Sequence, residues 1–432
     1  MEGKKVMNRW LVVVGGILVQ LCLGAIYAWS AFTGKLTAAD GLFQFSKTQT
    51  QIIFSVGLAV FALVMMLIAG KWQAKAGPRK VALTGGLILG IGYIIAGFSG
   101  ANFWGILLGV GVLGGAGIGL AYVCPIATCV KWFPDKKGLI TGLAVAGFGF
   151  GALIWIKLTS GFVFGPVDLT PGWKGLYGSG WAVSKVFTLY GILFAGLVSL
   201  GSILLVNPPD GWLPAGWTPT SGKAASSGQA NFSTNEMIKT AQYWSLFIIF
   251  MVSATCGLMV IGVIGLFGKD ALTANGVEAA NAVIISGTAM GLFYSIMNGF
   301  GRIIWGSFSD VIGRKNAIVC MCALQGIMMI IFFFIGGNEI GLYLCAAVIG
   351  FNFGGNFALF PAATADFFGN KNVGTNYPWV FMAYGVGGIA GPLLGGYMGD
   401  IKKWELAFIP AGVACLVGMI IALSLKAPKK AA

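Results

Sequence analysis

Residues 51–80 read QIIFSVGLAVFALVMMLIAGKWQAKAGPRK, an apolar run followed at once by a short basic loop. The run between Gln51 and Lys71 contains no charged residue. About 20 apolar residues are what an α-helix needs to cross a bilayer. Apolar runs and short polar loops alternate in the same way along the chain, which predicts an all-α protein that crosses a membrane many times.

Twelve such runs can be counted in the 432 residues. They cover approximately 9–33, 49–72, 80–100, 102–130, 138–164, 186–206, 242–268, 281–307, 316–336, 339–365, 374–399 and 404–425. The segment between the sixth and seventh runs is rich in Pro, Ser and Gly, which is typical of a linker. We therefore predict two six-helix bundles, 1–206 and 241–432, joined by a cytoplasmic linker over 207–240.

The composition excludes other classes of protein. Charged residues make up 9% and hydrophobic residues 57%, whereas a soluble domain is nearer one quarter charged. The net charge of +14 would suggest nucleic acid in a soluble protein, but no soluble segment interleaves basic residues with aromatics. Basic residues in cytoplasmic loops face anionic lipid instead. We expect the lipid bilayer as a partner and no nucleic acid.

The basic residues also predict the orientation. Of the 27 Lys and Arg, 18 lie on the side that carries both termini and 7 on the other side. The positive-inside rule then places both termini in the cytoplasm. We expect the protein in the inner (plasma) membrane of the cell. The first run lacks a cleavage pattern after it, so we expect it to be retained as a span. The two remaining basic residues, Lys157 and Arg302, fall inside spans.

Enzyme and metal chemistry have little support in the sequence. There is no His, and the eight Cys all lie in apolar runs, where we expect buried, inert thiols without a metal or cofactor. No nucleophile–base pair occurs within the spans, so we do not expect an enzyme. The GxGxxG pattern at 109–114 lies inside a span. We interpret it, with the glycines at 147–151 and 387–395, as close helix packing rather than a nucleotide site.

Arg302 is the main candidate for binding. A charge inside a span is costly, so it should face a cavity and have a partner, yet no Asp or Glu lies in the central part of a span. A substrate carboxylate would match the guanidinium fork, and a structural Arg bonded to backbone carbonyls is the alternative. Asn298, one turn earlier, would orient Arg302, bind the substrate or simply pack. Lys157 would snorkel to the outer interface or line the substrate path.

Aromatic side chains in the spans are further candidates for the lining of a pocket, although each of them alone is more often a packing residue. The set is Tyr27, Tyr122, Phe148, Phe353, Phe357, Phe381 and Tyr384.

A loop motif occurs twice, at corresponding places in the two halves. It reads GKWQAKAGPRK at 70–80 after the second run and GSFSDVIGRK at 306–315 after the eighth. The duplicated motif resembles the loop signature of the major facilitator superfamily. The resemblance implies a gating role for Asp310, Arg314 and Arg79, although Ala74 replaces the acid in the first copy.

More closely, the chain resembles the oxalate:formate antiporter family, which is allied to the monocarboxylate porters. The similar stretches are WFPDKKGL at 132–139, NGFGR at 298–302, ALFP at 358–361 with Asp366, and Asn376-Tyr377. The resemblance implies a cavity between the halves, with Arg302 as the substrate arginine and Tyr27 and Tyr122 as cage tyrosines. It also implies that Phe148, Phe353, Phe357 and Phe381 stand where the family has larger or hydroxylated aromatics.

The chain departs from that family at Tyr384, where the oxalate carrier has a second cation. One arginine balances one carboxylate, and a dianion would leave a charge unpaired. We therefore predict a monomeric secondary transporter of small monocarboxylates of the lactate, pyruvate, formate and acetate class, working by alternating access. Proton symport, with the proton carried on the substrate, and electroneutral exchange both stay open. Oxalate:formate antiport is the alternative, since Lys157 would supply a second cation.

Overall fold

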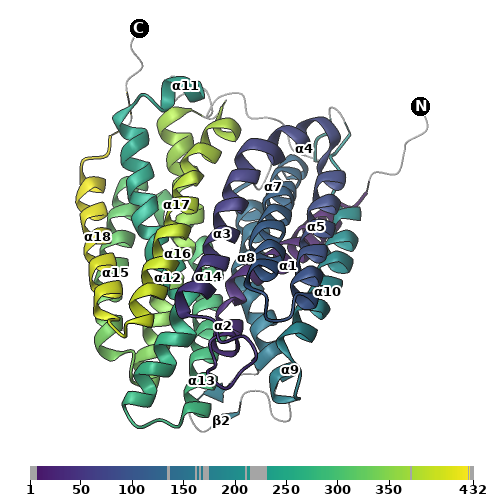
Figure 1. The fold of residues 1–432 in the computed structure, drawn as a ribbon. Coiled ribbons are helices and arrows are strands. Elements are labelled where there is room, and N and C mark those ends of the chain that lie inside the picture. Colours follow the sequence, from purple (N-terminus) through teal and green to yellow (C-terminus); the bar gives the residue numbers. More distant parts are fainter. Residues whose placement is uncertain are drawn as a thin grey trace.

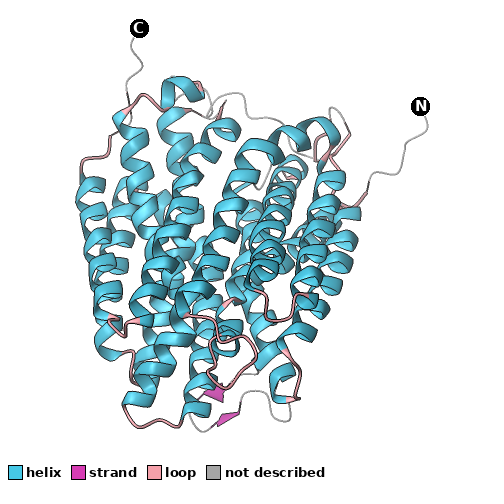
Figure 2. Cartoon of the chain, in the orientation of Figure 1, coloured by secondary structure: helices cyan, strands magenta, loops and turns pink. Residues whose placement is uncertain are grey.

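The computed structural model describes residues 7–133, 137–160, 163–164, 167–168, 175–209, 212–214, 231–369, 372–426 and 428. Within these residues, twelve helices are long and apolar enough to cross a membrane, which confirms the predicted spans and the all-α class. Figure 2 shows helix through the body of the molecule and two short strands at one end. The protein is therefore a multi-pass membrane protein with twelve spans in the described residues.

The first half contains six spans, several of them built from consecutive pieces. Its elements are α1 (Arg9–Leu23), η1 (Gly24–Ala28), α2 (Ser30–Leu36), α3 (Lys47–Val64), η2 (Met65–Ala69), α4 (Gly70–Ala76), α5 (Pro78–Phe98), α6 (Phe103–Ile106), η3 (Leu107–Gly114), α7 (Gly115–Trp132), α8 (Lys137–Ser160), β1 (Val163–Phe164), β2 (Val167–Asp168), α9 (Gly175–Gly178) and α10 (Val183–Ile203). The segment η1 is a 3-10 helix, whereas η2 and η3 are π-helical.

The second half repeats the pattern of six spans. Its elements are α11 (Thr234–Met237), α12 (Ala241–Ala274), α13 (Ala279–Thr288), the π-helical η4 (Ala289–Tyr294), α14 (Ser295–Ile312), α15 (Arg314–Ile335), α16 (Glu339–Phe368), α17 (Val373–Asp400) and α18 (Glu405–Leu423). Single π-helical turns inside α-helices are frequent at functional sites, and η4 lies directly before the helix that carries Arg302.

The two halves lie side by side in Figure 1, the first in purple to teal and the second in green to yellow. Helix α3 packs along α17, and α8 packs along α14, so these four helices form much of the boundary. We call the end where α1 begins and α18 ends the near end. The opposite end, with α2, α13 and β2, is the far end (Figure 1).

The structure differs from the sequence predictions at two places. The fifth span was expected to run to residue 164, but α8 ends at Ser160 and β1 pairs with β2 in a small antiparallel hairpin. Gly161 and Pro166 in this stretch disfavour helix. The linker contains the short helix α11, whose Ser233 and Glu236 form a capping box. Residues 134–136 of the stretch WFPDKKGL, and residues 210–211 and 215–230 of the predicted linker, lie outside the described residues.

The duplicated loop motif has the same backbone geometry in both halves. Gly77 has φ +82° and ψ 161° between α4 and α5, and Gly313 has φ +85° and ψ 151° between α14 and α15. This left-handed φ is accessible to glycine at no steric cost, so both helices turn sharply at the glycine of the motif. The shared conformation supports the internal repeat between the halves.

The glycine runs pack helices closely, as expected. A Cβ atom added at Gly109 would lie 2.4 Å from the carbonyl oxygen of Gly92, and one at Gly391 would lie 2.3 Å from that of Thr255. A backbone approach this close requires the absence of a side chain. The interpretation of 109–114 as a packing motif is therefore confirmed. The expectation for the thiols was wrong at Cys320, which is exposed on α15, where the bilayer offers it an apolar surface.

Candidate functional site

Arg302 lies in α14 and is 2% exposed. Its Nε donates a hydrogen bond to Oδ1 of Asn298, one turn earlier, over 3.1 Å. Its two terminal nitrogens, Nη1 and Nη2, are buried and make no well-formed hydrogen bond with the described residues, although the hydroxyl groups of Tyr27 and Tyr122 lie near the guanidinium. A buried cation in this state holds hydrogen-bond donors ready for an anion, because an unpaired charge in a low-dielectric site is costly.

Glycines on α14 allow this helix to lie tightly between α8 and α16. A Cβ at Gly299 would fall 2.3 Å from the Phe150 ring of α8, and one at Gly301 would fall 2.0 Å from the carbonyl oxygen of Phe351 of α16. The sequence Asn298–Arg302 therefore combines two polar side chains with the glycines that bring both halves close to them. This is the local reason that Arg302 sits at the boundary.

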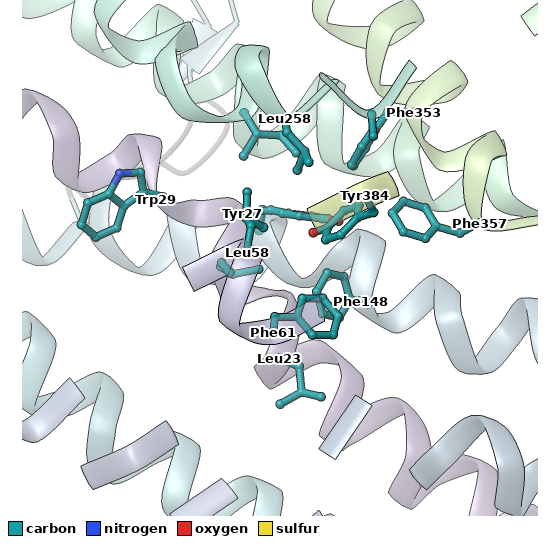
Figure 3. Close-up of a cluster of buried hydrophobic side chains, with 14 of the residues drawn as sticks. Leu23, Tyr27, Trp29, Leu58, Phe61, Phe148, Leu258, Phe353, Phe357 and Tyr384 are labelled. Atoms are coloured by element: carbon teal, nitrogen blue, oxygen red, sulfur yellow. The ribbon is translucent and has the colours of Figure 1, made fainter. Parts of the chain in front are cut away.

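Aromatic side chains from both halves meet beside Arg302. The Tyr27 and Tyr384 hydroxyl oxygens lie 3.2 Å apart, in hydrogen-bond contact across the boundary. Figure 3 shows Tyr27 and Tyr384 pointing toward each other, with Phe148 on one side and Phe353 and Phe357 on the other. The Tyr27 ring centroid is 5.0 Å from that of Phe148 and 5.7 Å from that of Phe353. Tyr27 belongs to the 3-10 segment η1, which interrupts the first span.

The remaining predicted aromatics join the same cluster. The Phe357 ring centroid is 4.1 Å from Cζ of Arg302, and the Phe148 centroid is 5.8 Å from it. Tyr122 packs against Phe148 at 5.2 Å and against Phe381 at 6.2 Å between centroids. Rings stacked on a guanidinium cover its flat faces and leave its N–H edge free for a ligand.

Sequence reasoning missed Phe61 of α3, which is 1% exposed and lies in the centre of this cluster. Its ring centroid is 5.1 Å from that of Tyr122 and 5.8 Å from that of Tyr384, so it bridges the two halves. Phe61 is one phenylalanine in a wholly apolar run, and nothing in its sequence context distinguishes it. Only the crossing of α3 with α17 reveals it.

Lys157 is not brought to this cluster. It is exposed in the last turn of α8. It lies eight residues beyond Gly149, which contacts Asn298, and this is about 12 Å along the helix at a rise of 1.5 Å per residue.

The predicted gating residues lie at the near end. Arg314 contacts Asp310 at 2.6 Å and Asp366 at 3.0 Å, which joins the ends of α14, α15 and α16. Arg79 donates to the carbonyl oxygen of Ile203, the last residue of α10. A cation at a helix C-terminus is favourable because the free carbonyls carry partial negative charge.

A polar network at the far end was not predicted. Lys47 of α3 contacts Asp270 of α12 at 2.5 Å, and the ring of Trp404 lies 5.0 Å from its ammonium. Asp400 of α17 accepts hydrogen bonds from the backbone N–H groups of Lys47 and Thr48, over 2.7 and 2.9 Å. The partners lie in three loop segments that are far apart in the sequence, so no local pattern signals the network. Lys47, Asp270 and Asp400 also line a cavity of about 230 Å³.

Metal chemistry has no candidate group in the part of the chain that the structure describes, where no three His, Cys, Asp or Glu side chains converge. The site is instead one buried guanidinium, one amide and a set of aromatic rings, suited to binding a small organic anion away from water.

Comparisons with known proteins agree with this architecture. The model of the Major Facilitator Superfamily matches residues 12–293 and 279–432. The uncharacterised MFS-type transporter YhjX of Escherichia coli (strain K12) is 30% identical over 88% of this chain and 86% of its own length. The oxalate:formate antiporter of Oxalobacter formigenes is 25% identical, over 96% and 91%. Apicoplast pyruvate carrier 1 of Toxoplasma gondii is 25% identical, over 87% and 81%. The chain belongs to the major facilitator superfamily of membrane transporters.

Proposed function

We propose that this protein is a secondary transporter of small monocarboxylates that works by alternating access, with Arg302 binding the substrate carboxylate. The carrying observation is the buried guanidinium with two unpartnered terminal nitrogens, enclosed by aromatics from both halves. A carboxylate pairs with the two nitrogens of such a fork in parallel. Asn298, Tyr27, Tyr122, Phe148, Phe353, Phe357, Phe381 and Tyr384 complete the proposed site.

Charge balance favours a monocarboxylate. Arg302 supplies one positive charge, and Tyr384, which is neutral, stands where the oxalate:formate antiporter family has a second cation. A dianion would keep one charge unpaired in the buried site. Two relatives, an oxalate:formate antiporter and a pyruvate carrier, support a small carboxylate as the substrate class.

Alternating access would move the half 1–206 against the half 241–432 around this site, with 207–240 as the cytoplasmic connection. We propose that the near end faces the cytoplasm of an inner-membrane protein and that the monomer is the working unit. Arg314 with Asp310, and Arg79 with the end of α10, would hold the helices of each half together while the halves move. In symport, a proton would cross together with the substrate. In exchange, a second anion would instead cross in the opposite direction.

The test is uptake of labelled L-lactate and pyruvate into proteoliposomes, with and without an inward proton gradient. We expect saturable uptake and counterflow, and accumulation with the gradient if transport is proton-coupled. Arg302→Ala should abolish uptake, a loss of at least about 100-fold, because a buried charge-assisted pair is removed. The control Lys75→Ala removes an exposed cation of α4 and should keep uptake. Wild-type uptake by a well-inserted Arg302→Ala protein would contradict the site.

Oxalate:formate exchange is the second candidate, favoured by the relative of that name. Tyr384→Lys would place a second cation against Tyr27 in the cluster, and we expect it to raise the affinity for oxalate. Competition by oxalate against labelled pyruvate measures this change. Strong oxalate counterflow by the wild-type protein would favour this candidate. If Tyr384→Lys leaves the affinity for oxalate unchanged, that result contradicts the charge-matching argument.

A further inference from the structure

The orientation of the Asn298 side chain follows from chemistry. The Nε–H group of Arg302 can only donate a hydrogen bond, so the atom of Asn298 that faces it at 3.1 Å must be the carbonyl oxygen Oδ1. The amide nitrogen Nδ2 therefore points elsewhere. Asn298 is 0% exposed, so Nδ2 is buried, and it has no hydrogen-bond partner among the described residues.

Contacts from both halves hold this pair in place. A Cβ at Gly149 of α8 would lie 3.1 Å from Oδ1 of Asn298 and 3.2 Å from Nε of Arg302. A Cβ at Gly354 of α16 would lie 2.1 Å from the carbonyl oxygen of Asn298. The backbones on either side thus approach the pair so closely that the amide and the guanidinium are positioned before a ligand arrives.

Three buried groups that only donate hydrogen bonds therefore remain: Nη1 and Nη2 of Arg302 and Nδ2 of Asn298. Since Nε is already engaged, a carboxylate must bind end-on to the two terminal nitrogens. The two carboxylate oxygens then face the guanidinium, and the amide donor, which belongs to a neighbouring side chain and points elsewhere, is best served by an acceptor of its own. Leaving a buried donor unpaired costs free energy, so the best ligand carries a third acceptor oxygen near its carboxylate.

We propose that Asn298 selects monocarboxylates with an oxo or hydroxyl group on carbon 2, such as pyruvate and lactate, over acetate, propionate and formate. This inference rests on the proposed function and narrows its substrate class. The oxygen on carbon 2 accepts from Nδ2 while the carboxylate binds Arg302. A neutral donor meets a neutral acceptor, so the single charge of Arg302 stays balanced by a single carboxylate.

The experiment compares pyruvate with propionate, which has the same number of carbons and the same charge at pH 7 but lacks the second-carbon oxygen. Each competes for pyruvate counterflow in proteoliposomes, and each is also tested for thermal stabilisation of the detergent-solubilised protein. We expect the wild-type protein to prefer pyruvate by at least about tenfold. In Asn298→Ala the ratio should fall toward one. The control Asn352→Ala removes another fully buried amide, on α16, and should keep the ratio.

Each outcome is informative. If Asn298 only positions Arg302, Asn298→Ala weakens both ligands equally, and the unchanged ratio overturns the inference. If that variant fails to insert, the wild-type ratio decides, and a ratio near one overturns the inference alone. If no monocarboxylate is transported and none stabilises a folded preparation, the proposed function fails together with it.

Discussion

The two ends of the molecule differ in what their polar contacts join. At the far end, Lys47 contacts Asp270, and Asp400 caps the start of α3, so these bonds cross from one half to the other. At the near end, Arg314 contacts Asp310 and Asp366, all in the second half, and Arg79 binds the end of α10 in the first. In the alternating access that we propose, the far-end bonds must break for a substrate to enter there, whereas the near-end bonds can persist while the halves move.

The largest effect should come from locking the far end. Thr48→Cys with Asp400→Cys, in a Cys320→Ser background, replaces a contact between the halves with a disulfide. We expect oxidation to stop transport and a reductant to restore it, because alternating access requires this end to open. Pyruvate uptake before and after reduction measures the effect.

The matched pair for this lock is Thr234→Cys with Asn376→Cys at the near end, where the Thr234 hydroxyl donates to Oδ1 of Asn376 over 2.9 Å. Its disulfide joins α11 to α17 and does not involve the first half, so oxidation should change the uptake of that double variant little. Complete inhibition by the near-end disulfide, or uptake that survives a fully formed far-end disulfide, would break the distinction between the ends.

A smaller effect is expected from Lys47→Met, which removes the charged part of the far-end network. The side chains of Lys47 and Asp270 are 18% and 34% exposed. An ion pair with partly exposed partners contributes roughly 0.2–1 kcal/mol, so the far end should open up to about fivefold more often. The reporter is Ser55→Cys, buried on α3 between the network and the aromatic cluster, labelled by a water-soluble maleimide. The same reporter with Lys75→Met should label at the original rate.

The smallest effects belong to the near end. Arg314→Ala leaves two carboxylates without their cation and should lower the thermal unfolding midpoint by a few degrees, without changing the labelling of Ser55→Cys. Asp310→Asn should cost less, about 0.5 kcal/mol or below, because its side chain is 66% exposed. Faster labelling in Arg314→Ala would show that this cluster, too, couples the halves.

Much of the fold was predictable because the bilayer imposes a simple rule. Each crossing needs a helix of about 20 apolar residues, and charged loops must lie outside. The apolar runs around Ile53 and Met329 can therefore be recognised as spans from the sequence alone. The close helix contacts were also predictable at Gly109 and Gly391, since glycine runs in a membrane helix have a packing reason.

The site was only partly predictable. Arg302 can be recognised as a candidate from the sequence, because a charge inside an apolar span is costly and such residues are usually functional. The aromatics around it are not distinguishable in this way, because the chain has 32 Phe and each looks like packing. Phe61 was missed for that reason, and the set of predicted aromatics depended on the family resemblance rather than on the residues alone.

The sequence by itself determined the class of protein, the twelve spans, the repeat of two halves and the one buried arginine, since hydrophobicity and charge are local properties of the chain. Only the tertiary structure decided which side chains face one another. It brought Lys47 to Asp270, 223 positions away, and Tyr27 to Tyr384, 357 positions away. Such pairings depend on how helices cross, which no local stretch of sequence encodes.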